Sequence, residues 1–92
     1  MSSQSLSIQD RIRTQVVAIL TRAHPDRAVS AGDLGEERDL RELGLDSLGL
    51  VNLMLAIEAE FDIFIPQADM VPQTFRSVST IATVVSALSL AA

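Results

Sequence analysis

The pair Asp46-Ser47 stands directly before a strongly apolar stretch and is this chain's candidate for chemistry on a hydroxyl group. A serine hydroxyl is a weak nucleophile unless a base lies next to it. The single histidine, His24, follows an earlier helical segment, and no Gly-x-Ser-x-Gly elbow surrounds Ser47. Aspartate and serine also begin helices often, because their oxygens accept free backbone N–H groups. The pair by itself therefore predicts a helix start and not a catalytic serine.

The composition excludes several other kinds of site. The chain has no cysteine, so disulfides, thiolate metal sites and cysteine nucleophiles are ruled out. One histidine argues against a histidine metal cluster. A run of carboxylates could suggest calcium, but it lacks the alternating ligands and the placed glycine of a calcium loop; its members are Asp33, Glu36, Glu37 and Asp39. We interpret this run as a solvated acidic loop and expect no metal.

The charge balance bears on partners and location. Twelve acidic residues face seven arginines and no lysine, which gives a net charge of -5. Nucleic acid would be repelled, whereas basic partner proteins are a natural match. The polar start of the chain lacks the apolar run of a signal peptide, and the last apolar stretch is interrupted by Ser86 and Ser89 and too short to cross a bilayer. We expect a cytoplasmic protein without a membrane or nucleic-acid partner.

Apolar spacing predicts three long helices and no strands. They run from about Ser7 to Ala23, from Ser47 to Phe61, and from near Ser77 to Leu88. Ser7 and Ser77 are N-cap candidates, and His24-Pro25 ends the first helix. Ninety-two residues suffice for one domain, so we predict an all-α fold, a small antiparallel bundle of three long helices plus one short helix.

Two connections join these helices. The first, His24 to Asp46, is long enough to need anchors in the core; the candidates are Leu34, Leu40, Leu43 and Leu45. Within it, residues 36–43 are compatible with an irregular helical turn. The second connection contains the predicted short helix, Gln67 to Val71, which Pro72 stops.

The second helix is more hydrophobic than one buried face requires. One stripe at helical spacing consists of Leu50, Leu53, Met54, Ile57 and Phe61. A second stripe on a neighbouring face consists of Leu48, Val51 and Leu55. Because the second stripe runs into Glu58 and Asp62, we assign it to the solvent side. A tightly wrapped bundle would bury both stripes, but an exposed strip beginning beside Ser47 favours a contact site for another protein.

Three segments, in the right order, resemble the acyl carrier protein family over roughly Ile8 to Leu88. The first segment resembles the modification site of that family; it is Leu43-Gly44-Leu45-Asp46-Ser47-Leu48. The second resembles the end of the family's second helix; it is Glu58-Ala59-Glu60-Phe61-Asp62-Ile63-Phe64-Ile65-Pro66. The third resembles the entry to the family's last helix; it is Thr74-Phe75-Arg76-Ser77-Val78.

The resemblance implies that Ser47 receives 4′-phosphopantetheine from coenzyme A through a phosphodiester, and that Asp46 lies where the modifying transferase can use it. The free N–H groups and partial positive charge of a helix start suit such a phosphate. The arm would hold an acyl or aminoacyl group as a thioester, so the chain would be a monomeric carrier without enzyme activity. We expect a single acyl-carrier domain over residues 7–90 after a flexible tail, residues 1–6.

The implied partners are a phosphopantetheinyl transferase and an AMP-forming acyl or aminoacyl ligase, an acyltransferase or a ketosynthase. They would meet an apolar centre of Leu48, Val51 and Leu55, with Glu58 and Glu60 on a charged rim. Fatty-acid carriers have a more acidic second helix; the matching positions here include Gly49, Asn52, Ala56 and Ala59. Partner choice should therefore depend more on apolar fit, to which Ile63 and Phe64 contribute.

These features resemble the discrete carriers of natural-product biosynthesis, of polyketide type or another specialised kind. Two alternatives remain. One is a housekeeping carrier of fatty-acid synthesis, against which the sparse acidity argues. The other is an unmodified helical module that docks through Leu48, Val51 and Leu55.

Overall fold

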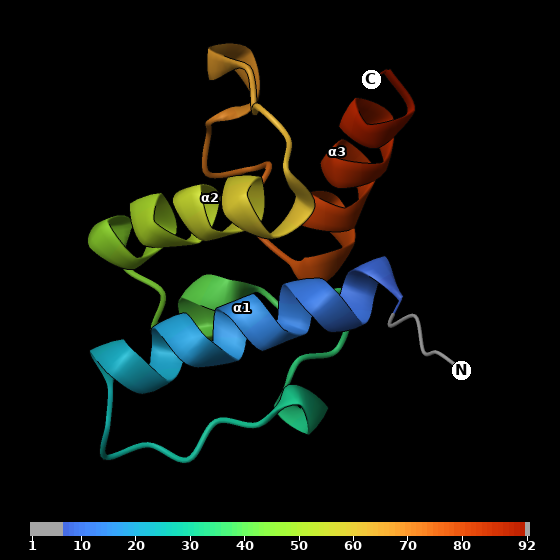
Figure 1. Ribbon diagram of the computed structural model, residues 1–92. Coiled ribbons are helices and arrows are strands. Elements are labelled where there is room, and N and C mark those ends of the chain that lie inside the picture. Colours follow the sequence, from blue (N-terminus) through green and yellow to red (C-terminus); the bar gives the residue numbers. More distant parts are fainter. Residues whose placement is uncertain (1–6, 92) are drawn as a thin grey trace.

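The computed structural model describes residues 7–91, and within them the chain forms three α-helices and no strand. The helices are α1 (Ile8–Ala23), α2 (Ser47–Phe61) and α3 (Val78–Ala91) (Figure 1). The predicted all-α class is confirmed. The predicted short helix is a single 3-10 turn, Gln67–Asp69, so the described chain is a bundle of three α-helices and not four. The predicted tail, residues 1–6, lies outside the described residues.

Each α-helix begins at the residue that its cap predicts. The Ser7 hydroxyl oxygen accepts from the Asp10 backbone N–H at 3.1 Å. Before α3, Ser77 Oγ accepts from the Thr80 N–H at 3.3 Å, while the Ser77 N–H donates to Thr80 Oγ1 at 3.1 Å. At its other end α3 continues three residues beyond the predicted Leu88, to Ala91. Leucine and alanine have high helix propensity, which favours this extension.

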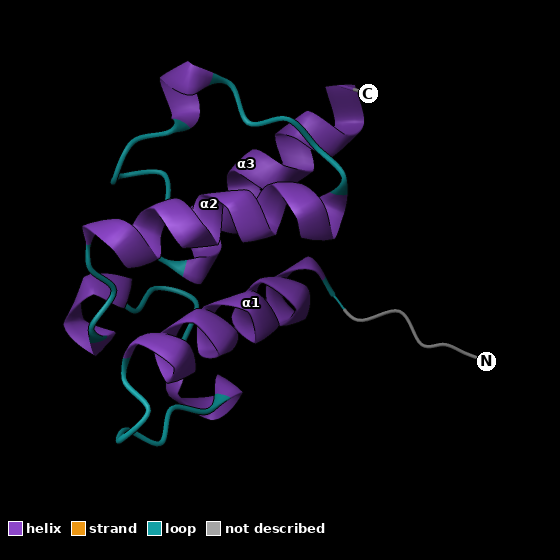
Figure 2. Ribbon diagram, turned by 60° about the vertical axis from the view of Figure 1, so that its left-hand side comes forward, coloured by secondary structure: helices purple, strands orange, loops and turns teal. Residues whose placement is uncertain are grey.

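Helix α1 is the element against which both other helices pack. In Figures 1 and 2, α1 and α2 lie side by side and run in opposite directions, whereas α3 rises away from them at a steep angle. The interior between the three helices holds the buried apolar side chains of all of them, including Leu20, Ile57 and Val85. Among the helices, α2 therefore packs mainly against α1.

The long connection between α1 and α2 is anchored as predicted. Leu34, Leu40 and Leu45 are buried, and Leu43 packs partly against the core. The connection contains two 3-10 turns, Ala31–Asp33 and Leu40–Leu43; the first of these was not predicted, and the second is shorter than the expected turn.

Backbone hydrogen bonds tie the same connection to the start of α3. The Leu40 N–H donates to the Arg76 carbonyl at 2.8 Å, and the Ser79 N–H donates to the Glu36 carbonyl at 2.8 Å. From α1, Arg13 Nε donates to the Leu34 carbonyl at 2.8 Å. The connection is thus held from both sides, which fixes the chain just before Ser47.

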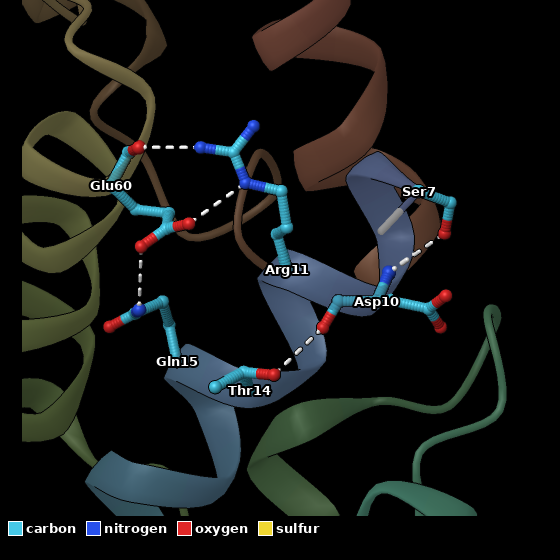
Figure 3. A network of polar contacts seen from close by, with 6 residues as sticks. All are labelled: Ser7, Asp10, Arg11, Thr14, Gln15 and Glu60. Atoms are coloured by element: carbon cyan, nitrogen blue, oxygen red, sulfur yellow. Dashed lines mark hydrogen bonds and ion pairs between the residues drawn. The ribbon is translucent and has the colours of Figure 1, made fainter. Parts of the chain in front are cut away.

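Arg11 of α1 binds the last turn of α2 through its guanidinium group (Figure 3). Its Nε donates to Glu60 Oε2 at 2.8 Å, and its Nη2 donates to the Glu60 backbone carbonyl at 2.8 Å. The guanidinium carbon lies 4.3 Å from the centre of the Phe61 ring. Gln15 Nε2 donates to Glu60 Oε1 at 3.1 Å, so both carboxylate oxygens of Glu60 bond to α1.

Replacing Arg11 by alanine should lower the free energy of unfolding by about 1–2 kcal/mol, through loss of the partly exposed ion pair and the cation–π contact. Urea denaturation followed by circular dichroism measures this, because the chain has no tryptophan or tyrosine. Arg22→Ala is the matched control, since it removes an exposed arginine from the same helix and should change stability less. Equal losses of unfolding free energy in the two variants would contradict a stabilising role for the contacts of Arg11 with α2.

Candidate functional site at the start of α2

Ser47 is the first residue of α2, and its side chain is exposed. Asp46 caps the helix: its Oδ1 accepts from the Gly49 N–H at 2.8 Å, and its carbonyl accepts from the Leu50 N–H at 2.8 Å. Within residues 7–91 the N–H groups of Ser47 and Leu48 have no hydrogen-bond partner. A reachable hydroxyl therefore stands at the positive end of a helix, beside two free donors.

Gly44 sets the path of the chain into this site. It has a left-handed backbone with φ 105°, and it ends the 3-10 turn Leu40–Leu43. The next residue, Leu45, enters the core, and Asp46 is then in place to cap α2. Most L-residues are strained at this φ, so the backbone itself requires glycine here.

The end of α1 holds the same segment. His24 Nε2 lies 2.9 Å from the Gly44 carbonyl, and Arg27 Nη1 donates to the Leu43 carbonyl at 3.1 Å. Because a carbonyl only accepts, the histidine Nε2 must carry the proton and donate. His24 is therefore a structural tie to the site and not a general base for Ser47.

Gly49 is buried, which corrects one inference from sequence. A Cβ at this position would lie 3.0 Å from Leu45 Cδ1 and 3.2 Å from Asp46 Oδ1. Gly49 matches a position that is acidic in fatty-acid carriers, but here it faces inward, where an acidic side chain would not fit. The sparse acidity of α2 rests instead on Asn52 and Ala59, which are exposed.

The second stripe of α2 is exposed, as predicted. Leu48, Val51 and Leu55 expose 70%, 50% and 57% of their surfaces, and we call these three residues the apolar strip. On the opposite side Leu53, Met54 and Ile57 are buried, whereas Leu50 and Phe61 are partly buried. An uncovered row of large aliphatic side chains on one helix is a typical protein contact surface.

The residues around Asp62 end α2 and fix the start of the segment that follows it. Asp62 terminates the helix with a left-handed φ of 52°. The Ile63 N–H then donates to the Glu58 carbonyl at 3.1 Å, and the Ile65 N–H donates to Glu58 Oε2 at 2.8 Å. Glu58 thus fastens the segment that buries Ile65 and leaves Phe64 78% exposed.

The two glutamates that the sequence places on the charged rim are both partly exposed, and both accept hydrogen bonds within the fold. The carboxylate of Glu60 bonds to Arg11 and Gln15 of α1. Glu60 keeps part of its surface exposed but is paired with α1, so its place on the charged rim stays a prediction. Spacing along one helix could not show that α1 supplies the partner of this charge.

Two depressions flank the start of α2. One, of about 380 Å³, is lined by Ser47 itself together with Arg41, Leu45, Asp46, Leu50, Pro72 and Phe75. The other, of about 330 Å³, lies toward α1 and is lined by Ile19, Arg22, Ala23, Asp46, Leu48, Gly49 and Asn52. Each depression contains one arginine beside the carboxylate of Asp46, so a guanidinium is available on either side of the start of α2.

Sequence reasoning did not identify Arg41 as part of this site. Its side chain forms an ion pair with Asp39, with Nη2 and Oδ2 3.1 Å apart. Side-chain and backbone hydrogen bonds from Arg41 hold the pKa of Asp39 below its ordinary value. No local sequence signal distinguishes Arg41, because only folding brings it beside Ser47.

The site suits a phosphate ester on Ser47 better than it suits catalysis. Free helix N–H groups and a guanidinium are the donors that phosphate oxygens prefer. Among the described residues, no group of three or more histidine or acidic side chains could hold a metal ion. In the same residues, no helix is both long and apolar enough to cross a membrane.

Comparison with known proteins agrees with this interpretation. A family model described as a phosphopantetheine attachment site matches residues 10–85. The chain is 40% identical over 78 residues to aminoacyl carrier protein 2 of Bradyrhizobium diazoefficiens, covering 85% of this chain and 82% of that protein. It is 37% identical over 81 residues to aminoacyl carrier protein 1 of the same organism, covering 88% and 84%.

Two solved structures are also similar. One is a complex of Bradyrhizobium japonicum glycine:[carrier protein] ligase with its cognate carrier protein and an analogue of glycyl adenylate. Its matching chain has a TM-score of 0.69 and 36% identity, over 88% of this chain and 99% of that one. The other contains the same ligase with glycylated carrier protein, and matches with a TM-score of 0.67 and 36% identity, over 85% and 99%.

Proposed function

The chain belongs to the acyl carrier proteins, the family with a phosphopantetheine attachment site, and on that premise we propose that Ser47 carries the arm and that the cargo is an amino acid. Carriers of this family hold phosphopantetheine covalently. The group supplies a terminal thiol on which an acyl group is held as a thioester. The carrier itself needs no cysteine for this, and the chain has none.

The exposure of Ser47 at the first position of α2 is the observation that carries the proposal. A phosphopantetheinyl transferase would join Ser47 Oγ to the phosphorus of the pantetheine phosphate, breaking the pyrophosphate bond of coenzyme A and releasing adenosine 3′,5′-bisphosphate. The serine proton would leave to a base on the transferase, because His24 is occupied with the Gly44 carbonyl. Asp46 would face that enzyme with the carboxylate oxygen that does not cap α2.

Similarity to named aminoacyl carriers supports an amino acid as the cargo. Both Bradyrhizobium diazoefficiens relatives have that name, and both similar structures contain a glycine ligase. A glycyl adenylate analogue in one of them supports an AMP-forming ligase as the loading partner. Of the acyl and aminoacyl groups expected from the sequence, these similarities support the aminoacyl groups.

Intact mass spectrometry in two steps tests the function. Incubation with coenzyme A and a broad-specificity phosphopantetheinyl transferase should add the mass of one arm. Subsequent incubation with ATP, glycine and a glycine:[carrier protein] ligase should add one glycyl residue, which hydroxylamine removes because it is a thioester. Failure of the first step would contradict the carrier role. Success of the first step with loading of only fatty or malonyl groups would contradict the amino-acid cargo.

The apolar strip is the proposed contact surface for the ligase. Val51→Asp would place a charge at its centre, which should lower kcat/KM for loading about tenfold or more, as expected when a contact worth 1.4 kcal/mol or more is lost. Stability should change little, because Val51 is half exposed. Val71→Ser, an exposed apolar position outside the strip, is the control. Equal loading of both variants would contradict the strip as the contact.

Two substitutions of Glu58 separate its charge from its hydrogen bond to Ile65. Glu58→Gln keeps an oxygen acceptor but removes the charge, so it should retain stability and slow loading if the charge meets the partner. Glu58→Ala also leaves the Ile65 N–H without its acceptor, so it should unfold more easily, by about 1 kcal/mol. Urea denaturation and loading rates measure both effects. A Gln variant that loads like wild type would restrict Glu58 to a structural role.

A further inference from the structure

Arg41 lies beside Ser47 although it belongs to the 3-10 turn before α2. The two side chains line the same depression of about 380 Å³. Arg41 also lines a neighbouring depression together with Pro72, Gln73 and Arg76. Its side chain therefore stands between the attachment serine and the segment that leads into α3.

The present partner of Arg41 is easily exchanged. Its Nη2 lies 3.1 Å from Asp39 Oδ2, and its Nε donates to Oδ1 at 3.3 Å. The Arg41 side chain is 66% exposed, and that of Asp39 is 22% exposed. Because the guanidinium side of this pair lies largely in solvent, the pair stabilises the fold only slightly, and replacing one anion by another costs little. The Arg41 backbone N–H, at 2.9 Å from Asp39 Oδ1, would hold Asp39 in place after the guanidinium turned away.

We propose, on the premise that Ser47 carries the arm, that Arg41 exchanges Asp39 for the phosphodiester on Ser47 and so positions the base of the arm beside α2. A phosphodiester keeps its negative charge throughout the pH range of folded proteins, and the planar guanidinium can give it two parallel hydrogen bonds. The free N–H groups at the start of α2 favour the same anion.

Location selects Arg41 over the other arginine beside this helix start. Arg22 lines the depression toward α1, and Ser47 is absent from that lining. Arg41 shares its depression with Ser47 and with the apolar side chains of Leu45, Leu50, Pro72 and Phe75. An anion on Ser47 paired with Arg41 is therefore drawn toward the Pro72 side and away from α1.

NMR of the unmodified and the arm-bearing protein tests the exchange directly. Asp39 faces Arg41 and, at longer range, Arg76, while Arg41 also faces Glu42. In the unmodified chain the lowered Asp39 pKa contributes stability above the ordinary carboxyl pKa, and this contribution is lost as pH falls through the folded pKa. Attachment should raise the pKa of Asp39 toward its ordinary value and should shift the Arg41 Nε–H resonance.

A pair of variants distinguishes the guanidinium from the general charge of the loop. Arg41→Gln and Arg38→Gln remove the same charge from the same connection, but Arg38 pairs with Glu42 and lines a different depression. Both variants should accept the arm, as intact mass will show. The phosphorus resonance of the arm should shift in Arg41→Gln and stay at the wild-type position in Arg38→Gln.

The outcomes separate the two proposals. The role of Arg41 is overturned if the arm is attached but the Arg41 resonance and the Asp39 pKa are unchanged. It is also overturned if the phosphorus resonance is the same in the Arg41 and Arg38 variants. In either case Ser47 remains the attachment point. If no arm is attached to the wild-type chain, the proposed function fails, and the role of Arg41 fails with it.

Discussion

Ser47→Ala is expected to abolish attachment of the arm completely, because no other hydroxyl stands at the start of α2. The fold should survive, since Asp46 and not Ser47 caps the helix. Stability should stay within about 0.5 kcal/mol of wild type, as is usual for exposed positions without a structural role. Intact mass after incubation with coenzyme A and a transferase gives the result, and circular dichroism confirms that the variant is folded.

Ser89→Ala is the matched control, because Ser89 is also an exposed helical serine. It should accept one arm as wild type does. An arm on the folded Ser47→Ala variant would place the attachment point elsewhere, and peptide mapping would then find it. If neither variant accepted the arm, the loss in Ser47→Ala could not be assigned to the Ser47 hydroxyl, and the prediction would be contradicted.

Gly44→Ala is expected to produce the largest loss of stability, about 2–4 kcal/mol, from left-handed strain together with overpacking. A Cβ at this position would lie 2.8 Å from His24 Nε2 and 2.9 Å from Arg27 Nη1. His24 cannot retreat without losing its hydrogen bond to the Gly44 carbonyl. A domain of this size is stable by only about 5–15 kcal/mol, so the change should be plain in urea denaturation.

Gly35→Ala is the control for this effect. Gly35 lies in the same connection, its backbone φ is not in the left-handed region, and a Cβ would meet no atom within 4 Å. The substitution should be neutral or stabilise by about 0.4–1 kcal/mol, through a less flexible unfolded chain. Similar destabilisation by the two alanines would show that Gly44 is not special. A folded Gly44→Ala should also accept the arm more slowly, because Asp46 and Ser47 follow it.

The helices were predictable because their signals are local. The predicted second helix, Ser47 to Phe61, agrees with the structure at both ends, since Asp46 caps it and its apolar spacing continues to Phe61. The exposed strip was predictable because charges at its far end marked the solvent side. The periodicity of apolar side chains says nothing about a glycine, however, so it could not reveal that Gly49 is buried.

The contacts that fix the site were not predictable. His24, Arg27 and Arg13 all donate to backbone carbonyls, and every residue in a sequence offers the same carbonyl. Arg41 gave no signal for a related reason. Only the fold places Arg41 near Ser47 of α2 and near the segment before α3.

The basic side chains that line the depressions near Ser47 are all arginines, and this has a chemical consequence for the cargo. Arg22, Arg41 and Arg76 line the nearby depressions, and the chain has no lysine at all. A thioester is an electrophile that a free amine captures irreversibly. A lysine with a pKa of about 10.4 always has a small deprotonated fraction, whereas arginine stays protonated and inert. A chain without a lysine or cysteine side chain therefore supplies positive charge beside Ser47 without any side-chain amine or thiol that could become acylated by its own passenger.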